Sequence, residues 1–154
     1  MKLYTIDRKQ IIPASIIAVW EFFSDPHNLS RITPLWLNLV VPEDTPHHVY
    51  PGMMITYQVR AVAGIPTTWV TEITQVLNKQ LFVDEQRFGP YRFWHHQHHF
   101  IETNEGVEVR DQVHYSLPLG PLGRLTHALV IQARLKEIFD YRVGAIRTEF
   151  RQKS

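Results

Sequence analysis

The sequence of 154 residues contains no cysteine. A disulfide scaffold, a thiol nucleophile and any cysteine-ligated zinc or iron–sulfur site are therefore excluded. The absence also agrees with a reducing compartment, in which disulfides rarely persist.

Neither an excess of one charge nor a long hydrophobic run is present. The 16 Lys and Arg residues against 15 Asp and Glu residues give a formal net charge of +1, whereas binding to a phosphate backbone usually needs a strongly basic surface. No run approaches 18 consecutive apolar residues, and the N-terminus lacks the basic-then-apolar pattern of a secretory signal. We therefore expect a cytoplasmic protein with no nucleic-acid partner and no stable membrane insertion.

The sequence does contain enough apolar material for one core. Hydrophobic residues make up 44% of the chain, and a chain of this length buries about 68–70% of the surface that it exposes when unfolded. We expect a single domain over residues 1–154.

The order of the apolar patterns at the N-terminus predicts a strand followed by two short helices. Residues 3–12 mix β-branched and aromatic side chains with polar ones and stop at Pro13, which is typical of a strand that ends before a helix. The first helix is indicated by the helical spacing of Ile16, Val19, Trp20 and Phe23. Asp25 followed by Pro26 can cap the second helix.

Between residues 35 and 117 short β-rich runs alternate with turn residues, which is typical of an antiparallel meander. Six strands are predicted there, at residues 36–42, 53–63, 67–77, 80–88, 91–103 and 107–117. Helical spacing returns from residue 122 to residue 150 and predicts one long C-terminal helix. The expected fold is α+β: a curved, seven-stranded antiparallel sheet around this helix, with space between them for large side chains or a ligand.

The strand predicted at residues 91–103 has no clean apolar face. One parity carries Arg92, Trp94, His96, His98 and Phe100, and the other carries Tyr91, Phe93, His95, Gln97 and His99. Either orientation brings ring nitrogens or an amide into the interior. We therefore expect a cavity beside this strand rather than a dry core.

Asp111 lies in the middle of an otherwise apolar face of the next strand, in which Val109, Val113 and Tyr115 share its parity. Burying an unpaired carboxylate costs several kcal/mol, so we expect Asp111 to point inward and to bond to His98 or His96. A two-residue turn at Glu105 and Gly106 would place Asp111 opposite Phe100. A four-residue loop from Thr103 to Gly106 would place it opposite His98, and both registers keep these side chains on one face.

Three interpretations of the histidines stay open. His96, His98 and Asp111 could form a His₂-carboxylate metal site, but no further ligand is specified and alternating histidines more often form hydrogen bonds. They could also be satisfied core or rim histidines, or they could line a pocket and orient a ligand. We expect no metal and no cofactor. The predicted ligand-binding residues are Trp69, Gln86, Trp94, His96, His98, Asp111 and Tyr115.

Several local strings resemble the START-like, Bet v 1-like helix-grip superfamily, and in particular its bacterial ligand-binding SRPBCC branch. They lie at Phe23-Ser24-Asp25-Pro26, Ile32-Thr33-Pro34, Val83-Asp84-Glu85-Gln86, Gly89-Pro90-Tyr91, the alternating Trp94 to Phe100, and Leu117-Pro118-Leu119-Gly120-Pro121. The resemblance covers nearly the whole chain and implies a deep, largely hydrophobic cavity between the sheet and the C-terminal helix. Members of the superfamily bind lipids, sterols, polyketides or plant hormones, and some are polyketide cyclases or dehydratases.

Two main hypotheses for the function follow from these observations. The first is binding or carriage of a small, largely hydrophobic molecule by a monomer or homodimer. The alternative is a cyclase or dehydratase that uses His98 and Asp111 as a base and Tyr115 as an acid or oxyanion donor. A protein-interaction module with a vestigial cavity is a third possibility.

Overall fold

The structure is a computed structural model that describes residues 2–62 and 64–151. It contains an antiparallel sheet of six strands in the order β1-β6-β5-β4-β3-β2. The elements of the N-terminal half are β1 (Tyr4–Ile12), α1 (Ile16–Ser24), the 3₁₀ helices η1 (Pro26–Ile32) and η2 (Leu35–Leu37), β2 (Met54–Val62) and β3 (Ile65–Leu77). Then come β4 (Leu81–Phe88), β5 (Phe93–Thr103), β6 (Gly106–Ser116), α2 (Gly120–Thr126), the π-helical turn η3 (His127–Ile131) and α3 (Gln132–Arg151).

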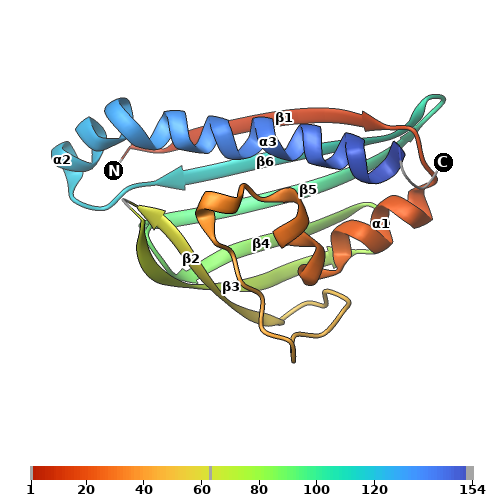
Figure 1. Ribbon diagram of the computed structural model, residues 1–154, viewed down its shortest axis with the longest axis horizontal. Helices are drawn as coiled ribbons and strands as arrows, with labels where there is room; N and C mark the ends of the chain where they lie inside the picture. The colour runs from red at the N-terminus through yellow and green to blue at the C-terminus, as the bar shows by residue number, and fades with distance from the viewer. Residues whose placement is uncertain (1, 63, 152–154) are drawn as a thin grey trace.

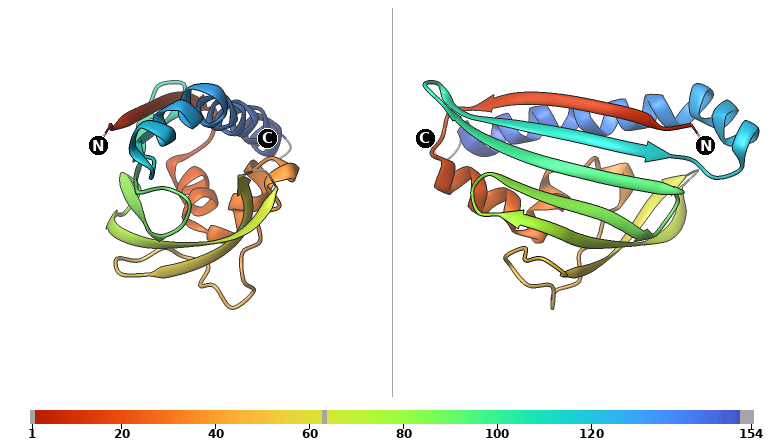
Figure 2. Two further views of the ribbon diagram at one scale, coloured as in Figure 1. Left: turned by 90° about the vertical axis from the view of Figure 1, so that its left-hand side faces the viewer. Right: turned by 180° about the vertical axis from the view of Figure 1, so that it is seen from behind.

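The sheet curls around the interior, and helices cover its open side. Figure 1 shows α3 running the length of the sheet, with α1 and η1 beside it. In the end-on view of Figure 2 the sheet forms a deep curve that these helices close. This arrangement is the expected helix grip, so the α+β class and the long C-terminal helix are confirmed.

Both short helices begin at a side-chain cap, and the one at Asp25 was expected from the sequence. Ser15 accepts a hydrogen bond from the backbone N–H of Ala18 at 3.2 Å, and Asp25 accepts one from the N–H of His27 at 3.0 Å. Each cap satisfies an N–H group that the first turn of a helix leaves without an internal partner. The two helices are therefore defined locally by sequence.

The seventh strand, predicted at residues 36–42, is wrong. Leu35–Leu37 form a 3₁₀ turn, Asn38 is left-handed with φ of 46°, and only Val40 forms an isolated bridge, to Gln58. Prolines at positions 34 and 42 flank this segment, and proline cannot donate a ladder hydrogen bond. The apolar run is therefore too constrained to join the sheet.

The C-terminal helix also differs from the uniform helix predicted at residues 122–150. It starts with α2 and passes through η3 before α3, and Figure 1 shows α2 extending beyond the end of β6. Leu125 and Leu129 belong to the apolar spacing that predicted this helix, yet both side chains are exposed, whereas Leu135 is buried. A π turn adds residues to the helical repeat and so shifts the phase of the stripe. Among the described residues, no helix is long and apolar enough to cross a membrane.

The hairpin between β5 and β6 has the register that places Asp111 opposite His98. Thr103 pairs with Gly106 at its tip, so the turn itself consists of Asn104 and Glu105. The register is the one expected for the four-residue loop, although neither turn considered from the sequence has these bounds. Gly106 has φ of 131°, and a Cβ atom there would lie 2.1 Å from the backbone oxygen of Ile12. Glycine is required at this position because β1 and the hairpin approach so closely.

Candidate functional site

A cavity of about 160 Å³ lies between the sheet and α3. For scale, an engineered apolar cavity of about 150 Å³ in another protein admits benzene. Most of the wall is apolar and comes from η1, the middle of the sheet and α3, including Ile55, Val59, Phe82, Leu135, Ile138 and Phe139. The expected cavity is therefore confirmed. Arg134 also lines it although that side chain is 54% exposed, so the cavity reaches the surface beside α3.

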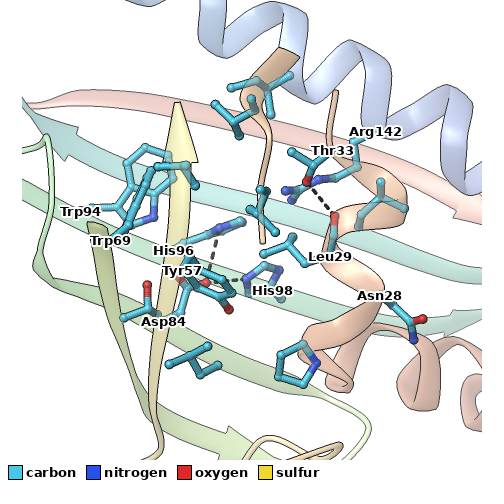
Figure 3. Close-up of a pocket in the computed structure, with 18 of the residues that line it drawn as sticks. Asn28, Leu29, Thr33, Tyr57, Trp69, Asp84, Trp94, His96, His98 and Arg142 are labelled. Atoms are coloured by element: carbon cyan, nitrogen blue, oxygen red, sulfur yellow. Dashed lines mark hydrogen bonds and ion pairs between the residues drawn. The ribbon is translucent and has the colours of Figure 1, made fainter. Parts of the chain in front are cut away.

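Asp84, His96, His98 and Arg142 form one ionisable group in the apolar wall. Asp25 and Arg134 also line the cavity, and their side chains are partly exposed. Figure 3 shows Asp84, His96 and His98 close to Tyr57, Arg142 nearer α3, and Trp69 and Trp94 further along the wall. His96 and His98 are on the inner face of β5 between Trp94 and Phe100, and all four of these side chains are buried. On the inner face of β5 the two imidazoles therefore lie between two aromatic side chains.

Two carboxylates from the neighbouring strands enclose the histidine pair. Strand pairing places Asp84 of β4 opposite His96 and Asp111 of β6 opposite His98. His96 Nε2 lies 2.8 Å from Asp111 Oδ1, and His98 Nε2 lies 2.7 Å from Asp84 Oδ2. The second ring nitrogens are also close to a carboxylate: His98 Nδ1 is 3.1 Å from Asp111 and His96 Nδ1 is 3.5 Å from Asp84.

The imidazole rings of His96 and His98 face each other, with centroids 3.7 Å apart. Each ring therefore contacts both carboxylates. The expectation that Asp111 points inward and bonds to a histidine is confirmed, because Asp111 is buried and hydrogen-bonded to His96.

Arg142 supplies a positive charge from the helix side of the cluster. Its Nη1 lies 3.7 Å from Asp111 Oδ1, and its guanidinium lies over the ring of Phe139 at 5.0 Å from the centroid. Two carboxylates, one guanidinium and one protonated imidazole would make the cluster neutral. This count explains how so many charged groups are tolerated in an apolar wall.

The surroundings change the pKa values of these groups in different directions. Burial tends to raise the pKa of Asp111, but the contacts with His96 and His98 and the charge of Arg142 outweigh it and hold that pKa well below its usual range. Burial and the neighbouring His98 lower the pKa of His96. Burial also tends to lower the pKa of His98, but its contacts with Asp111 and Asp84 outweigh burial and raise that pKa. A proton in the cluster is therefore held preferentially by His98.

Four of the seven predicted ligand-binding residues, Trp69, Trp94, His96 and His98, line the cavity. Asp111 lies behind the histidines. Tyr115 is buried against Tyr4 with ring centroids 5.4 Å apart, and burial raises its pKa to about 12. Neither of these two residues is in the cavity wall.

Gln86 is engaged elsewhere, at the turn between β4 and β5. Its side-chain amide donates to the carbonyl of Tyr91 at 2.6 Å and accepts from the N–H of Tyr91 at 3.2 Å. These bonds close the turn, and Gln86 does not line the cavity.

Sequence reasoning missed several polar residues of the cavity wall, among them Tyr57, Asp84 and Arg142. Arg142 could have been found, because it continues the helical spacing of Leu135, Phe139 and Ile146 on the buried side of α3. Asp84 alternates with the buried Phe82 on β4. Asp111 was identified as a single carboxylate on a cleanly alternating apolar face. That signal is weaker on β4, because Val83 beside Asp84 is buried as well.

The curved sheet, the gripping helix and the cavity define a helix-grip protein with a ligand-sized interior. The chain matches the family described as polyketide cyclase/dehydrase and lipid transport over residues 12–138, and it belongs to that family. The match confirms the START-like, Bet v 1-like assignment and supports a role in ligand binding or cyclisation. A comparison with curated protein sequences gives no match.

Solved structures share the fold over nearly the whole chain. TTHA0849 from Thermus thermophilus is 18% identical, with a TM-score of 0.71, and the match covers 98% of this chain and 99% of that one. The Zhui aromatase/cyclase from Streptomyces sp. R1128 has a TM-score of 0.75 at 12% identity, covering 99% and 96%. A norcoclaurine synthase from Thalictrum flavum has a TM-score of 0.66 at 16% identity, covering 99% and 98%. At these identities the likeness shows the fold alone.

Proposed function

We propose that this protein binds or carries a small, largely hydrophobic molecule, of lipid or polyketide-like character, in the cavity between the sheet and α3. The observation that carries the proposal is the composition of the wall. It is apolar over most of its area, and Asp84, His96, His98 and Arg142 form a compact polar group within it. A pocket of this kind gains affinity from apolar contact and orients its ligand through a few polar atoms.

The aromatic side chains at one end of the cavity support this proposal. The rings of Trp69 and Trp94 are perpendicular, with centroids 5.2 Å apart, and Tyr91 lies 4.7 Å from Trp94. All three line the cavity. Such a corner would hold a flat or branched apolar group, while the histidines would take a hydroxyl or carbonyl of the same molecule.

The proposal is tested by identifying what the protein retains. Native mass spectrometry of the purified chain should show a bound small molecule, and extraction should release it. Ile138→Trp, which places a larger ring at the cavity wall, should abolish retention. Ile101→Trp is the matched control, because Ile101 is exposed on β5 and does not line the cavity, so retention should be unchanged. Equal retention by both variants would contradict the proposed site.

A cyclase or dehydratase is the second candidate, and one observation favours it. His96 and His98 are in contact, yet their surroundings move their pKa values in opposite directions. Paired groups with separated pKa values are typical of acid and base assignments in enzymes. In this chain Tyr57 rather than Tyr115 reaches the cavity, so Tyr57 is the better placed phenol to donate to a substrate.

Asp111→Asn separates the two candidates, because it keeps the side-chain volume and removes the charge. A binding protein should retain much of its affinity for the extracted molecule. A general-base enzyme should still bind but lose turnover by about 10²–10⁴-fold. The measurement is a titration with the extracted molecule beside a product assay on the same samples.

A further inference from the structure

We propose that Asp84, His96 and His98 bind a divalent transition-metal ion such as Zn²⁺ in the cavity wall, with Asp111 holding the two imidazole rings from behind. This departs from the sequence expectation of no metal, which considered Asp111 as the carboxylate ligand and missed Asp84. The proposal goes beyond the proposed function, because metal binding can be measured with no organic ligand present.

The donor atoms are already close to the spacing that one ion requires. Asp84, His96 and His98 each offer a donor atom within 4.8 Å of the other two. Asp84 Oδ2 is 3.5 Å from His96 Nδ1 and 2.7 Å from His98 Nε2. Ligands bound at about 2.0–2.2 Å to one zinc ion lie about 3.0–3.5 Å apart. The His96 distance fits as it stands, and the His98 distance needs to open by only a few tenths of an ångström.

Asp111 occupies the position of an outer carboxylate. It approaches His96 Nε2 and His98 Nδ1, which are the ring nitrogens other than those that face Asp84. Metal-binding histidines usually donate their second N–H to a carboxylate, which fixes the tautomer and the direction of the lone pair. Here one carboxylate serves both rings, and Arg142 at 3.7 Å balances its charge.

One buried atom indicates that the cluster is not fully satisfied by its own hydrogen bonds. His98 Nδ1 lies 3.1 Å from Asp111, but it is buried and not in hydrogen-bond geometry with any partner among the described residues. Buried polar atoms are normally satisfied. An ion bound at His98 Nε2, on the side of Asp84, would leave the ring proton on Nδ1, from which it can donate toward Asp111.

The three proposed ligands face the cavity, whereas Asp111 does not line it. An ion held by three protein ligands would therefore keep its open coordination positions toward the cavity, which is typical of metal sites that bind small molecules. Two imidazoles and one carboxylate suit Zn²⁺, Fe²⁺ or Co²⁺ rather than Mg²⁺ or Ca²⁺. An oxygen atom of a cavity ligand, such as a carbonyl or hydroxyl, is the group that such an ion would bind.

A second group of the same composition, Asp25, His27 and His47, also brings its donor atoms within 4.8 Å of one another, so the test has to separate the two. The double variant His27→Asn/His47→Asn removes both surface imidazoles and leaves the cavity intact. The full-length chain, stripped with a chelator, is titrated with Zn²⁺ by calorimetry. The wild type and this double variant should each bind one equivalent with the same affinity.

Variants of the cavity cluster should lose that binding. Asp84→Asn and His96→Gln should each weaken Zn²⁺ binding by more than 100-fold, and Asp111→Asn should weaken it by about 10–100-fold, as for other outer carboxylates. Circular dichroism establishes that each variant is folded. Unchanged Zn²⁺ affinity in folded Asp84→Asn would overturn the proposal.

X-ray absorption on the Zn²⁺-loaded double variant keeps the test decisive even if a cavity variant fails to fold. The spectrum should show two imidazole nitrogens and at least one oxygen in the first coordination shell. Failure of the double variant to bind Zn²⁺, or a shell without imidazole, would overturn the proposal. Neither readout depends on whether the cavity holds an organic molecule, so this result and the retention test succeed or fail separately.

Discussion

This chain brings one aspartate and two histidines together in two places, and the two groups differ in what surrounds them. On the surface, Asp25 Oδ1 lies 2.8 Å from His27 Nδ1, and Oδ2 lies 3.0 Å from His47 Nδ1. The side chain of His47 is 72% exposed. In the cavity, His96 and His98 are buried, and a carboxylate lies on each side of the ring pair.

The comparison shows that residue type and spacing alone do not define a site. Asp25 is already used as the cap of η1, since its Oδ1 accepts the backbone N–H of His27. Among the described residues, no second carboxylate orients the rings of His27 and His47. Solvent can also replace any of these contacts at little cost. The cavity group differs, because its histidines and Asp111 are buried and the loss of a partner there is costly.

The largest expected effect is a difference in the free energy of unfolding between variants of Asp111 and Asp25. Asp111→Ala should lower the free energy of unfolding by about 3–5 kcal/mol, because it removes the carboxylate that contacts the buried Arg142 and one of the two that contact the buried histidines. Urea denaturation monitored by tryptophan fluorescence measures this loss. Asp111→Asn is the control that preserves volume and part of the hydrogen bonding, and it should lose less. A loss from Asp111→Ala no larger than that from Asp25→Ala would break the comparison.

The second effect concerns ligand affinity rather than folding. Trp94→Ala should weaken binding of the extracted molecule by about 2–4 kcal/mol, since the indole offers a large apolar surface to the cavity. Trp36→Ala is a useful reference. Trp36 also lines the cavity but donates its Nε1–H to Glu137 at 2.9 Å, near the surface, and a smaller loss is expected. Titrations of both variants against the wild type give the difference, and equal losses would place the ligand near the surface end instead.

The sequence predicted one half of the cavity cluster and missed the other half for a physical reason. Asp111 was found because β6 alternates cleanly and a single carboxylate stands among valines on its inner face. The same alternation is hard to follow on β4, because Glu85 and Gln86 follow Asp84 and the pairing of β3 with β4 shifts register twice. A bulge changes which parity faces inward. Asp84 therefore needed the three-dimensional pairing with His96 to be recognised.

The fold was predictable to a greater extent than the site. The turn residues and the strand lengths indicated an antiparallel meander. The apolar spacing from Ile16 to Phe23 marked the first short helix, and Asp25 followed by Pro26 marked the second. The run at residues 36–42 was misassigned because its apolar content outweighed the prolines on either side. The π turn at His127–Ile131 could not be predicted from the spacing of apolar residues, because that spacing assumes one constant helical period.

The third prediction tests the surface aspartate as a cap. Asp25→Ala should cost about 1 kcal/mol of stability, within the range of 0.5–2 kcal/mol for lost N-caps. The loss should depend on pH. Burial tends to raise the pKa of Asp25, but hydrogen bonds from His47 and His27 outweigh it and lower that pKa. A depressed folded-state pKa stabilises the fold above the unfolded value of about 3.9 and loses this contribution as the pH falls through the folded value.

Urea denaturation of the wild type and Asp25→Ala at pH 7, 5 and 3 measures this dependence. The difference between the two proteins should be full at pH 7, nearly full at pH 5, and smaller at pH 3. Asp25→Asn serves as the control, because asparagine is an equally good cap without a titrating group. A difference that grows as the pH falls would contradict the role assigned to the ionised carboxylate.

The smallest expected effect is that of His47→Gln, and it is the strictest test of the contrast between the two groups. His47 contacts Asp25 and the ring of His27, with centroids 4.6 Å apart, but most of its side chain is in water. An exposed pair of this kind contributes little, so the free energy of unfolding should change by less than about 0.5 kcal/mol.

His96→Gln, the matched change in the cavity, should cost several times more, because the buried Asp111 would lose its 2.8 Å partner. Parallel urea curves for the two variants give the comparison directly. Equal costs would mean that burial and the second carboxylate do not distinguish the cavity group from the group of Asp25, His27 and His47.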